Sequence, residues 1–327
     1  MRRRPIAVVS AVLGFAAIMA GGARITPSPL HAHAAGPAEA DVTAPADANT
    51  SAVRLAFAAQ RYRTPIFPGA SVTTATYGQA PDLISGAPVT LQLDVYRPTG
   101  DSATSRPLLV WIHGGGFSGG NRGQMASEAI AYARLGYVTA SISYRLDPGN
   151  HCGEVQAGLY SGDQLVAERD RCLRAILAAR DDAATAIGWL RAHAATYGID
   201  PTRVAVGGSS AGAITAIHVG ETLNTPGSPP PAESQVSAVL AMSGCNYIAG
   251  SIDAFDAPIA IAASGGDPLV PFACSVATID AAAAVGTDVQ RHYFALESAH
   301  AQGLYVAHRD EIDRSWRLFL IDHLHLV

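Results

Sequence analysis

Short apolar runs alternate with longer amphipathic segments along most of the chain, and this alternation restricts the fold more than any other feature. The run PLLVWIH at 107–113 is apolar throughout, which is typical of a strand covered on both faces. Further strands are expected at 89–98, 137–146, 202–210, 236–244, 257–265 and 289–298, and helices at 124–136, 180–198, 211–221, 274–286 and 312–325. We therefore predict an α/β domain with a mostly parallel central sheet and helices on both faces.

The N-terminal 34 residues have the pattern of a secretory signal. Three arginines at 2–4 precede a short apolar stretch at 6–20, and small residues at 32–34 or 21–23 offer a cleavage site. A membrane span needs about 20 apolar residues. We therefore predict a cleaved signal at 1–34, export to the periplasm or the medium, and no stable membrane anchor.

The rest of the chain divides at one change of composition. Residues 35–52 are rich in Ala, Pro, Asp and Thr, which predicts a disordered leader. No similar linker follows, so residues 53–327 are predicted to form one catalytic domain. The formal net charge is −5, which gives no basic surface for nucleic acid, and we predict no nucleic-acid partner.

An exported protein can form disulfides, and this chain has four cysteines. Four cysteines allow three pairings. We favour Cys152–Cys172 and Cys245–Cys274, because each pair encloses a short connection; free buried thiols are the alternative. The cysteine and histidine spacing does not match a zinc site, so no metal is predicted.

The sequence GGSSAG at 207–212 predicts a nucleophile. A serine exposed on a sharp turn between strand and helix needs small residues two positions before and after it. Gly208 and Gly212 stand at those positions around Ser210, whereas Ser209 has only one glycine there. Ser210 is therefore the predicted nucleophile, and Ser209 is expected to pack or hydrogen-bond at the turn.

A nucleophilic serine also needs donors for the oxyanion that forms on the carbonyl. Three glycines follow His113, directly after the most apolar strand. We predict the amides of Gly115 and Gly116 as donors, together with that of Ala211, which begins a helix. His113 is expected to have a structural role in orienting this glycine loop.

The base and its partner are expected after later strands, because sites in such sheets lie beyond the carboxyl ends of the strands. Asp267 follows the strand at 257–265, and His300 follows the strand at 289–298. We predict that His300 accepts the proton of Ser210 and that Asp267 orients the imidazole. The rival candidates, Asp253, Asp256, His292, His308, His323 and His325, precede a strand or fall within or near a strand or helix, and are expected at structural or surface positions.

Together these motifs resemble the alpha/beta-hydrolase superfamily, and within it the bacterial esterase/lipase branch related to hormone-sensitive lipase. The resemblance is carried by LDVYRP, HGGGFSGGN, ISYRLDP, the segment 181–212, ASGGDPLVPF and ESAHAQG. It implies an alpha/beta-hydrolase fold, no cofactor, and hydrolysis of carboxylic esters with short acyl chains through an acyl-enzyme on Ser210.

Two departures from that branch lead to further expectations. About thirty residues separate Pro148 from the helix expected at 180, and we predict a disulfide-closed loop there, near the mouth of the site. The connection between the strands near Ser243 and Ala257 is short, so no large lid is expected. The short stretch at 53–85 also argues against a helical cap.

The sequence thus predicts a secreted serine carboxylesterase that acts on a small-molecule or polymer-borne ester. A peptidase, amidase or acyltransferase with the same triad is the first alternative. A non-catalytic binding domain is the second, although such domains typically lack the nucleophile or the histidine, and this chain has both.

Overall fold

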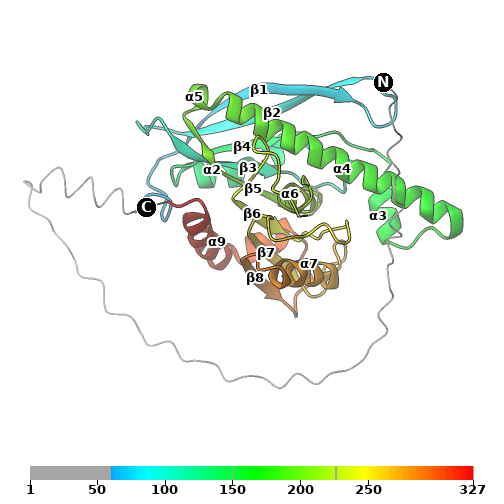
Figure 1. Cartoon of the computed structure of the whole chain (residues 1–327). Coiled ribbons are helices and arrows are strands. Elements are labelled where there is room, and N and C mark those ends of the chain that lie inside the picture. Colours follow the sequence, from blue (N-terminus) through cyan, green and yellow to red (C-terminus); the bar gives the residue numbers. More distant parts are fainter. Residues whose placement is uncertain (1–59, 150, 225–226, 327) are drawn as a thin grey trace, which may run out of the picture. The chain divides into compact units, whose positions relative to one another are not determined.

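The computed structural model describes residues 60–149, 151–224 and 227–326 (Figure 1). The predicted signal at 1–34 and leader at 35–52 lie outside the described residues. A central eight-stranded sheet has the order β1-β2-β4-β3-β5-β6-β7-β8. The strands are β1 Ala70–Pro81, β2 Pro88–Pro98, β3 Arg106–Ile112, β4 Val138–Ile142, β5 Ile199–Ser209, β6 Ala238–Met242, β7 Ile259–Ser264 and β8 Val289–Phe294. From β4 to β8 all pairings are parallel, which confirms the mostly parallel sheet.

Helices cover both faces of this sheet, as predicted. They are α2 Ala126–Ala133, α3 His151–Gln156, α4 Gly162–Ala192, α5 Ala194–Tyr197, α6 Ala211–Glu221, α7 Phe272–Ala284, α8 Gln302–Ala307 and α9 Arg309–His323. Buried side chains of α4, α6 and α7 share one core, and those of α2, α8 and α9 share the other.

Strand β3 shows why the sequence folds in this way. All seven of its residues are buried. Leu108, Val110 and Ile112 face the core of α4 and α6, while Leu109 and Trp111 face the core of α2 and α9. Successive side chains of a strand point to opposite faces, so a continuously apolar strand fills both cores. Each such side chain stabilises the fold by about 1.5–3 kcal/mol.

The prediction of a loop between Pro148 and residue 180 is wrong. The segment forms α3 and the first half of α4, which begins at Gly162. Its charged and helix-forming residues have mostly exposed or half-exposed side chains, so the apolar periodicity that marks a buried helix is weak. The Cys152–Cys172 disulfide joins these two helices, with Cα atoms 4.9 Å apart.

The second disulfide, Cys245–Cys274, joins the turn after β6 to α7, with Cα atoms 5.6 Å apart. Both pairs are those favoured from the sequence. The connection from β6 to β7, residues 243–258, contains no helix or strand, so no lid is inserted at this point of the fold. Strand β1 and helix α8 were not expected, and β4 and β8 end several residues before their predicted limits.

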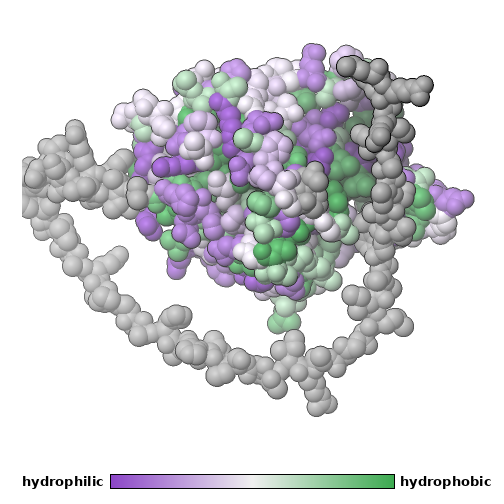
Figure 2. All heavy atoms as spheres, in the orientation of Figure 1, coloured by the Kyte–Doolittle hydropathy of each residue, from purple (hydrophilic) through white to green (hydrophobic). Residues whose placement is uncertain are grey.

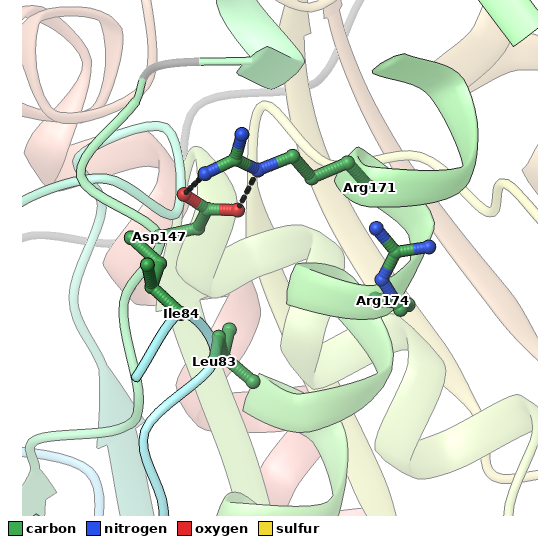
Figure 3. A pocket seen from close by; sticks show the side chains of 5 residues that line it. All are labelled: Leu83, Ile84, Asp147, Arg171 and Arg174. Carbon is green, nitrogen blue, oxygen red and sulfur yellow. Dashed lines mark hydrogen bonds and ion pairs between the residues drawn. The ribbon is translucent and has the colours of Figure 1, made fainter. Parts of the chain in front are cut away.

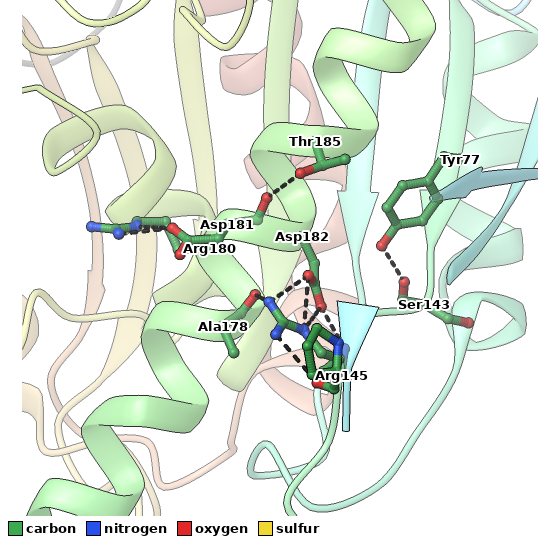
Figure 4. Close-up of polar contacts among 9 residues, drawn as sticks. Tyr77, Ser143, Arg145, Ala178, Arg180, Asp181, Asp182 and Thr185 are labelled. Atoms are coloured by element: carbon green, nitrogen blue, oxygen red, sulfur yellow. Dashed lines mark hydrogen bonds and ion pairs between the residues drawn. The ribbon is translucent and has the colours of Figure 1, made fainter. Parts of the chain in front are cut away.

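A partly buried ion pair fixes the segment that follows β4 (Figure 4). Arg145 donates to the Asp182 carboxylate of α4 from its backbone amide at 2.8 Å and from Nε at 3.0 Å. Burial raises the pKa of Asp182, and the hydrogen bonds from Arg145 oppose that rise. The Tyr77 hydroxyl adds a 2.6 Å bond to the Ser143 carbonyl. The segment is therefore held against α4 and β1.

Two buried carboxyl groups lie together at the end of α6. Glu221 is fully buried beside Asp256. Burial, reinforced by the neighbouring Asp256, raises the pKa of Glu221 well above its ordinary value. Burial also raises the pKa of Asp256 to about 6. Since two adjacent carboxylates resist simultaneous ionisation, the folded pair holds a proton that the unfolded chain releases at lower pH.

This pair predicts a pH dependence of stability. Both pKa values are higher in the folded protein, so the proton bound by this pair stabilises the fold. This stabilisation is complete below about pH 4 and declines as the pH rises through about 6. Glu221→Gln should reduce that decline between about pH 4.5 and 7.5 by on the order of 1–3 kcal/mol. Urea unfolding at both pH values measures the free energy of unfolding of each variant. Glu233→Gln, at an exposed position, is the control. An unchanged pH slope in Glu221→Gln would contradict the assignment.

Candidate active site

Ser210 occupies a strained turn between β5 and α6. Its φ is +57° and its ψ is −120°, a conformation that costs a non-glycine residue about 1–3 kcal/mol. The Ser210 amide donates to the Met242 carbonyl at 2.8 Å, which fixes the turn to β6. A Cβ on Gly208 would overlap the Gly212 carbonyl, and a Cβ on Gly212 would overlap the Ile112 carbonyl. The turn therefore requires both glycines.

The three predicted triad residues meet at the carboxyl edge of the sheet. His300 Nε2 lies 2.8 Å from Ser210 Oγ. His300 Nδ1 lies 2.8 and 2.9 Å from the two carboxylate oxygens of Asp267. Ser210 follows β5, Asp267 follows β7 and His300 follows β8, so three separate loops build this chain of hydrogen bonds.

The surroundings of Asp267 keep its carboxyl group ionised. Burial raises its pKa, but hydrogen bonds from His300 and from the Val270 and Leu269 amides outweigh this effect and hold the pKa below its usual range. The two amides lie 2.9 Å from Oδ1. An ionised Asp267 favours the tautomer with a proton on Nδ1 of His300, which leaves the Nε2 lone pair directed at Ser210.

The glycine loop packs against Ser210. A Cβ on Gly114 would lie 2.9 Å from the Ser209 carbonyl oxygen and 3.2 Å from Ser210 Cβ. Gly115 and Gly116, the next residues, have φ of +117° and +60°. Ala211 is the first residue of α6, where backbone amides lack partners within the helix. Gly114 thus lies against the turn of Ser210, and the amides of Gly115, Gly116 and Ala211 stay the predicted oxyanion donors.

His113 is fully buried at the base of this loop. Its Nδ1 lies 2.7 Å from the Gly114 carbonyl, and its ring stacks on Tyr144 at 4.3 Å. The Tyr144 hydroxyl donates to the His113 carbonyl at 2.9 Å. Burial lowers the pKa of His113, so its ring stays neutral. These contacts suit a residue that holds the loop in place.

The rival acids and bases lie in other surroundings. Asp253 and Asp256 hydrogen-bond to each other's backbone near the end of α6. Each of three histidines faces a carboxylate outside the triad: His292 with Glu311, His308 with Glu297, and His323 with Asp288. Among the described residues, Asp288, Asp322 and His323 alone have their ligand atoms within 4.8 Å of one another, and both aspartates are exposed. This surface group carries no metal assignment.

A pocket of about 290 Å³ lies beside Asp147, in the segment that follows β4 (Figure 3). Its lining residues are Leu83, Ile84, Asp147, Arg171 and Arg174. Arg171 binds the Asp147 carboxylate at 2.7 and 2.9 Å, and the Asp147 amide donates to the Phe117 carbonyl at 2.8 Å. Helix α4 is thereby linked to the chain immediately after Gly116.

Two further residues of the site went unrecognised in the sequence. Ser243 and Ser264 are fully buried at the ends of β6 and β7 and bond the chain on either side of His300. Their signal is the Ser-Gly pair that follows each apolar strand. Such a pair ordinarily marks only the end of a strand, and its bonding partners become visible only in the folded molecule.

The close approach of Gly114 predicts a large effect of a single methyl group. Gly114→Ala should push the Ser209–Ser210 backbone away from His300 and lower kcat for p-nitrophenyl acetate by roughly 10²-fold. Gly119→Ala is the matched control in the same loop, because a Cβ there meets no atom within 4 Å. Equal kinetics for the two folded variants would contradict this view of the loop.

Models of known protein families match two segments of this chain. A family model described as BD-FAE matches residues 93–153, and a model described as alpha/beta hydrolase fold matches residues 174–244. Over these two segments the chain is similar to alpha/beta hydrolases. The resemblance read from the sequence is thus confirmed, and the matched segments contain the glycine loop and the turn with Ser210.

Solved structures show the same alpha/beta-hydrolase fold. The apo form of Thermogutta terrifontis esterase 2 is 22% identical with a TM-score of 0.57, covering 79% of this chain and 96% of that one. Among curated proteins, phenmedipham hydrolase of Pseudarthrobacter oxydans is 32% identical over 46% of this chain and 26% of its own length. Lipase 2 of Geotrichum candidum is 29% identical over 43% and 24%. The chain therefore spans about a quarter of the length of these curated relatives.

Proposed function

We propose that the protein is a serine hydrolase of carboxylic esters. The observation that carries this proposal is the unbroken chain of hydrogen bonds from Asp267 through His300 to Ser210, next to the glycine loop. The named relatives, which include lipases and esterases, support an ester as the substrate. The substrate is a small-molecule or polymer-borne ester.

In the proposed reaction His300 Nε2 takes the proton of Ser210 as Oγ attacks the ester carbonyl. The carbonyl oxygen becomes an oxyanion, which accepts hydrogen bonds from the amides of Gly115, Gly116 and Ala211. Asp267 stabilises the imidazolium. The C–O bond then breaks, and the leaving alcohol takes the proton from His300.

The second half of the reaction repeats these roles with water. His300 removes a proton from a water molecule, whose oxygen attacks the acyl group on Ser210. The second oxyanion collapses, the acid leaves, and Ser210 recovers its proton from His300. Only Ser210 and His300 change their protonation state in this cycle, while Asp267 stays ionised and the oxyanion donors stay protonated.

Short acyl chains and export complete the proposal. Structures of the Thermogutta terrifontis esterase include propionate-bound and butyrate-bound forms, which supports short chains. Export is supported by the signal pattern at 1–34 and by the two disulfides. In the described ranges, no helix is long and apolar enough to cross a bilayer.

A panel of p-nitrophenyl esters from acetate to palmitate tests this function. The purified protein should hydrolyse acetate and butyrate esters, and kcat/KM should decline with longer chains. A matched p-nitroanilide of a short acid should react far more slowly, because an amide leaving group is harder to expel. Hydrolysis of the anilide without the esters, or of neither, would refute the proposal. Product analysis with added alcohol separates hydrolysis from acyl transfer.

A further inference from the structure

The short loop that carries His300 is held on both sides by buried hydroxyl groups. On one side Ser264 Oγ donates to the Ala299 carbonyl at 2.6 Å. On the other side the Ala301 amide donates to Ser243 Oγ at 2.9 Å. Both serines are fully buried. The residues immediately before and after the imidazole are thus tied to the ends of two neighbouring parallel strands, β7 and β6.

Ser243 is itself fixed in an uncommon conformation. Its φ is +55°, and its amide donates to the Ala262 carbonyl of β7 at 2.8 Å. At the end of β6, the Ser243 hydroxyl accepts its bond from the Ala301 amide. One residue therefore joins the end of β6, β7 and the loop of the base.

The loop needs such support. Ala301 has a φ of +44°, which an alanine adopts only under constraint. Beyond it, the Gln302 side chain donates to the buried Glu128 carboxylate at 2.7 Å. Nearer the sheet, the Gly266 amide donates to the Glu297 carbonyl at 2.7 Å. These two hydrogen bonds lie farther along the loop, whereas Ser264 and Ser243 bond to the residues directly before and after His300.

We propose that Ser243 and Ser264 are positioning residues of the site: together they clamp the backbone on both sides of His300. The inference rests on the proposed function, in which His300 is the base. The two serines differ in one respect that an experiment can use, since Ser264 donates to the loop before His300 and Ser243 accepts from the loop after it.

Ser243→Gly is the sharpest variant. Glycine adopts a φ of +55° without strain, so the backbone turn is retained while the hydroxyl is lost. Ser243→Ala and Ser264→Ala complete the set. Thr139→Val is the matched control, because it removes a buried hydroxyl that bonds the Ala129 carbonyl at 2.8 Å, between β4 and α2. Circular dichroism and thermal unfolding establish that each variant folds.

The clamp predicts a kinetic signature. Ser243→Gly and Ser264→Ala should each lower kcat for p-nitrophenyl acetate by roughly 10- to 100-fold with little change in KM, because only the placement of the imidazole is altered. Both variants should leave the acidic limb of the kcat/KM profile in place, because neither removes a titratable group. Thr139→Val should keep kcat unchanged.

A second readout separates the clamp from the proposed function. The proton between His300 Nδ1 and Asp267 should give a low-field NMR resonance in the wild type whether or not esters are hydrolysed. In Ser243→Gly that resonance should broaden or disappear. An inactive wild type would refute the esterase proposal and leave this test intact. A folded Ser243→Gly with wild-type kcat and low-field resonance would overturn the clamp.

Discussion

Ser210→Ala should lower kcat for p-nitrophenyl acetate by at least about 10⁴-fold while leaving the protein folded. The hydroxyl removed is the one at 2.8 Å from His300 Nε2, and the rest of the hydrogen-bonded chain to Asp267 stays in place. Without Oγ no acyl-enzyme can form, so the remaining rate reflects substrate binding and oxyanion stabilisation alone.

Ser209→Ala is the matched control for this variant. The side chain of Ser209 is buried at the end of β5, and His300 Nε2 faces its neighbour. The control should therefore keep kcat within a few-fold of wild type. If Ser209→Ala lost the activity and Ser210→Ala kept it, the assignment of the nucleophile would be wrong.

Asp267→Asn should lower kcat by roughly 10⁴-fold, the size of effect seen when an amide replaces the acid of a serine-protease triad. The amide nitrogen of asparagine can donate to His300 Nδ1, which favours the tautomer with its proton on Nε2. That tautomer cannot accept the proton of Ser210. The loss should extend through neutral pH, because the pKa of Asp267 is held low and the wild-type carboxylate is ionised there.

The natural control for Asp267→Asn is a second Asp–His pair. Asp288 lies 3.0 Å from His323 Nε2 and is exposed, outside the triad. Asp288→Asn should leave kcat unchanged over the pH range in which Asp267→Asn is inactive. Kinetics from about pH 5 to 9 compare the two variants. Comparable losses in both would show that the effect does not depend on the tautomer of His300.

Features that depend on neighbours in the sequence were the ones that could be predicted. The apolar strand β3 and the turn at Ser210 are both encoded within a few residues: the first by continuous apolar side chains, the second by glycines at two fixed positions. Asp267 and His300 could be located because they follow recognisable strands. Their roles still depend on the 2.8 Å contacts that the fold supplies.

Features that depend on distant parts of the chain were missed. The first half of α4 has few buried side chains, so its periodicity gave no helix signal, although the disulfide to α3 was anticipated. Ser243 and Ser264 are ordinary strand-end serines in the sequence. They gain a role only because parallel strands bring their ends beside the loop of His300.

The central claim is that Ser210, and no other residue, forms the covalent intermediate. Reaction with a fluorophosphonate followed by peptide mass spectrometry tests this most directly. We predict one adduct per molecule, on the peptide that contains Ser210, with esterase activity lost in proportion to labelling. An enzyme that stays active when Ser210 is fully labelled, or that carries its inactivating adduct on another residue, would contradict the account.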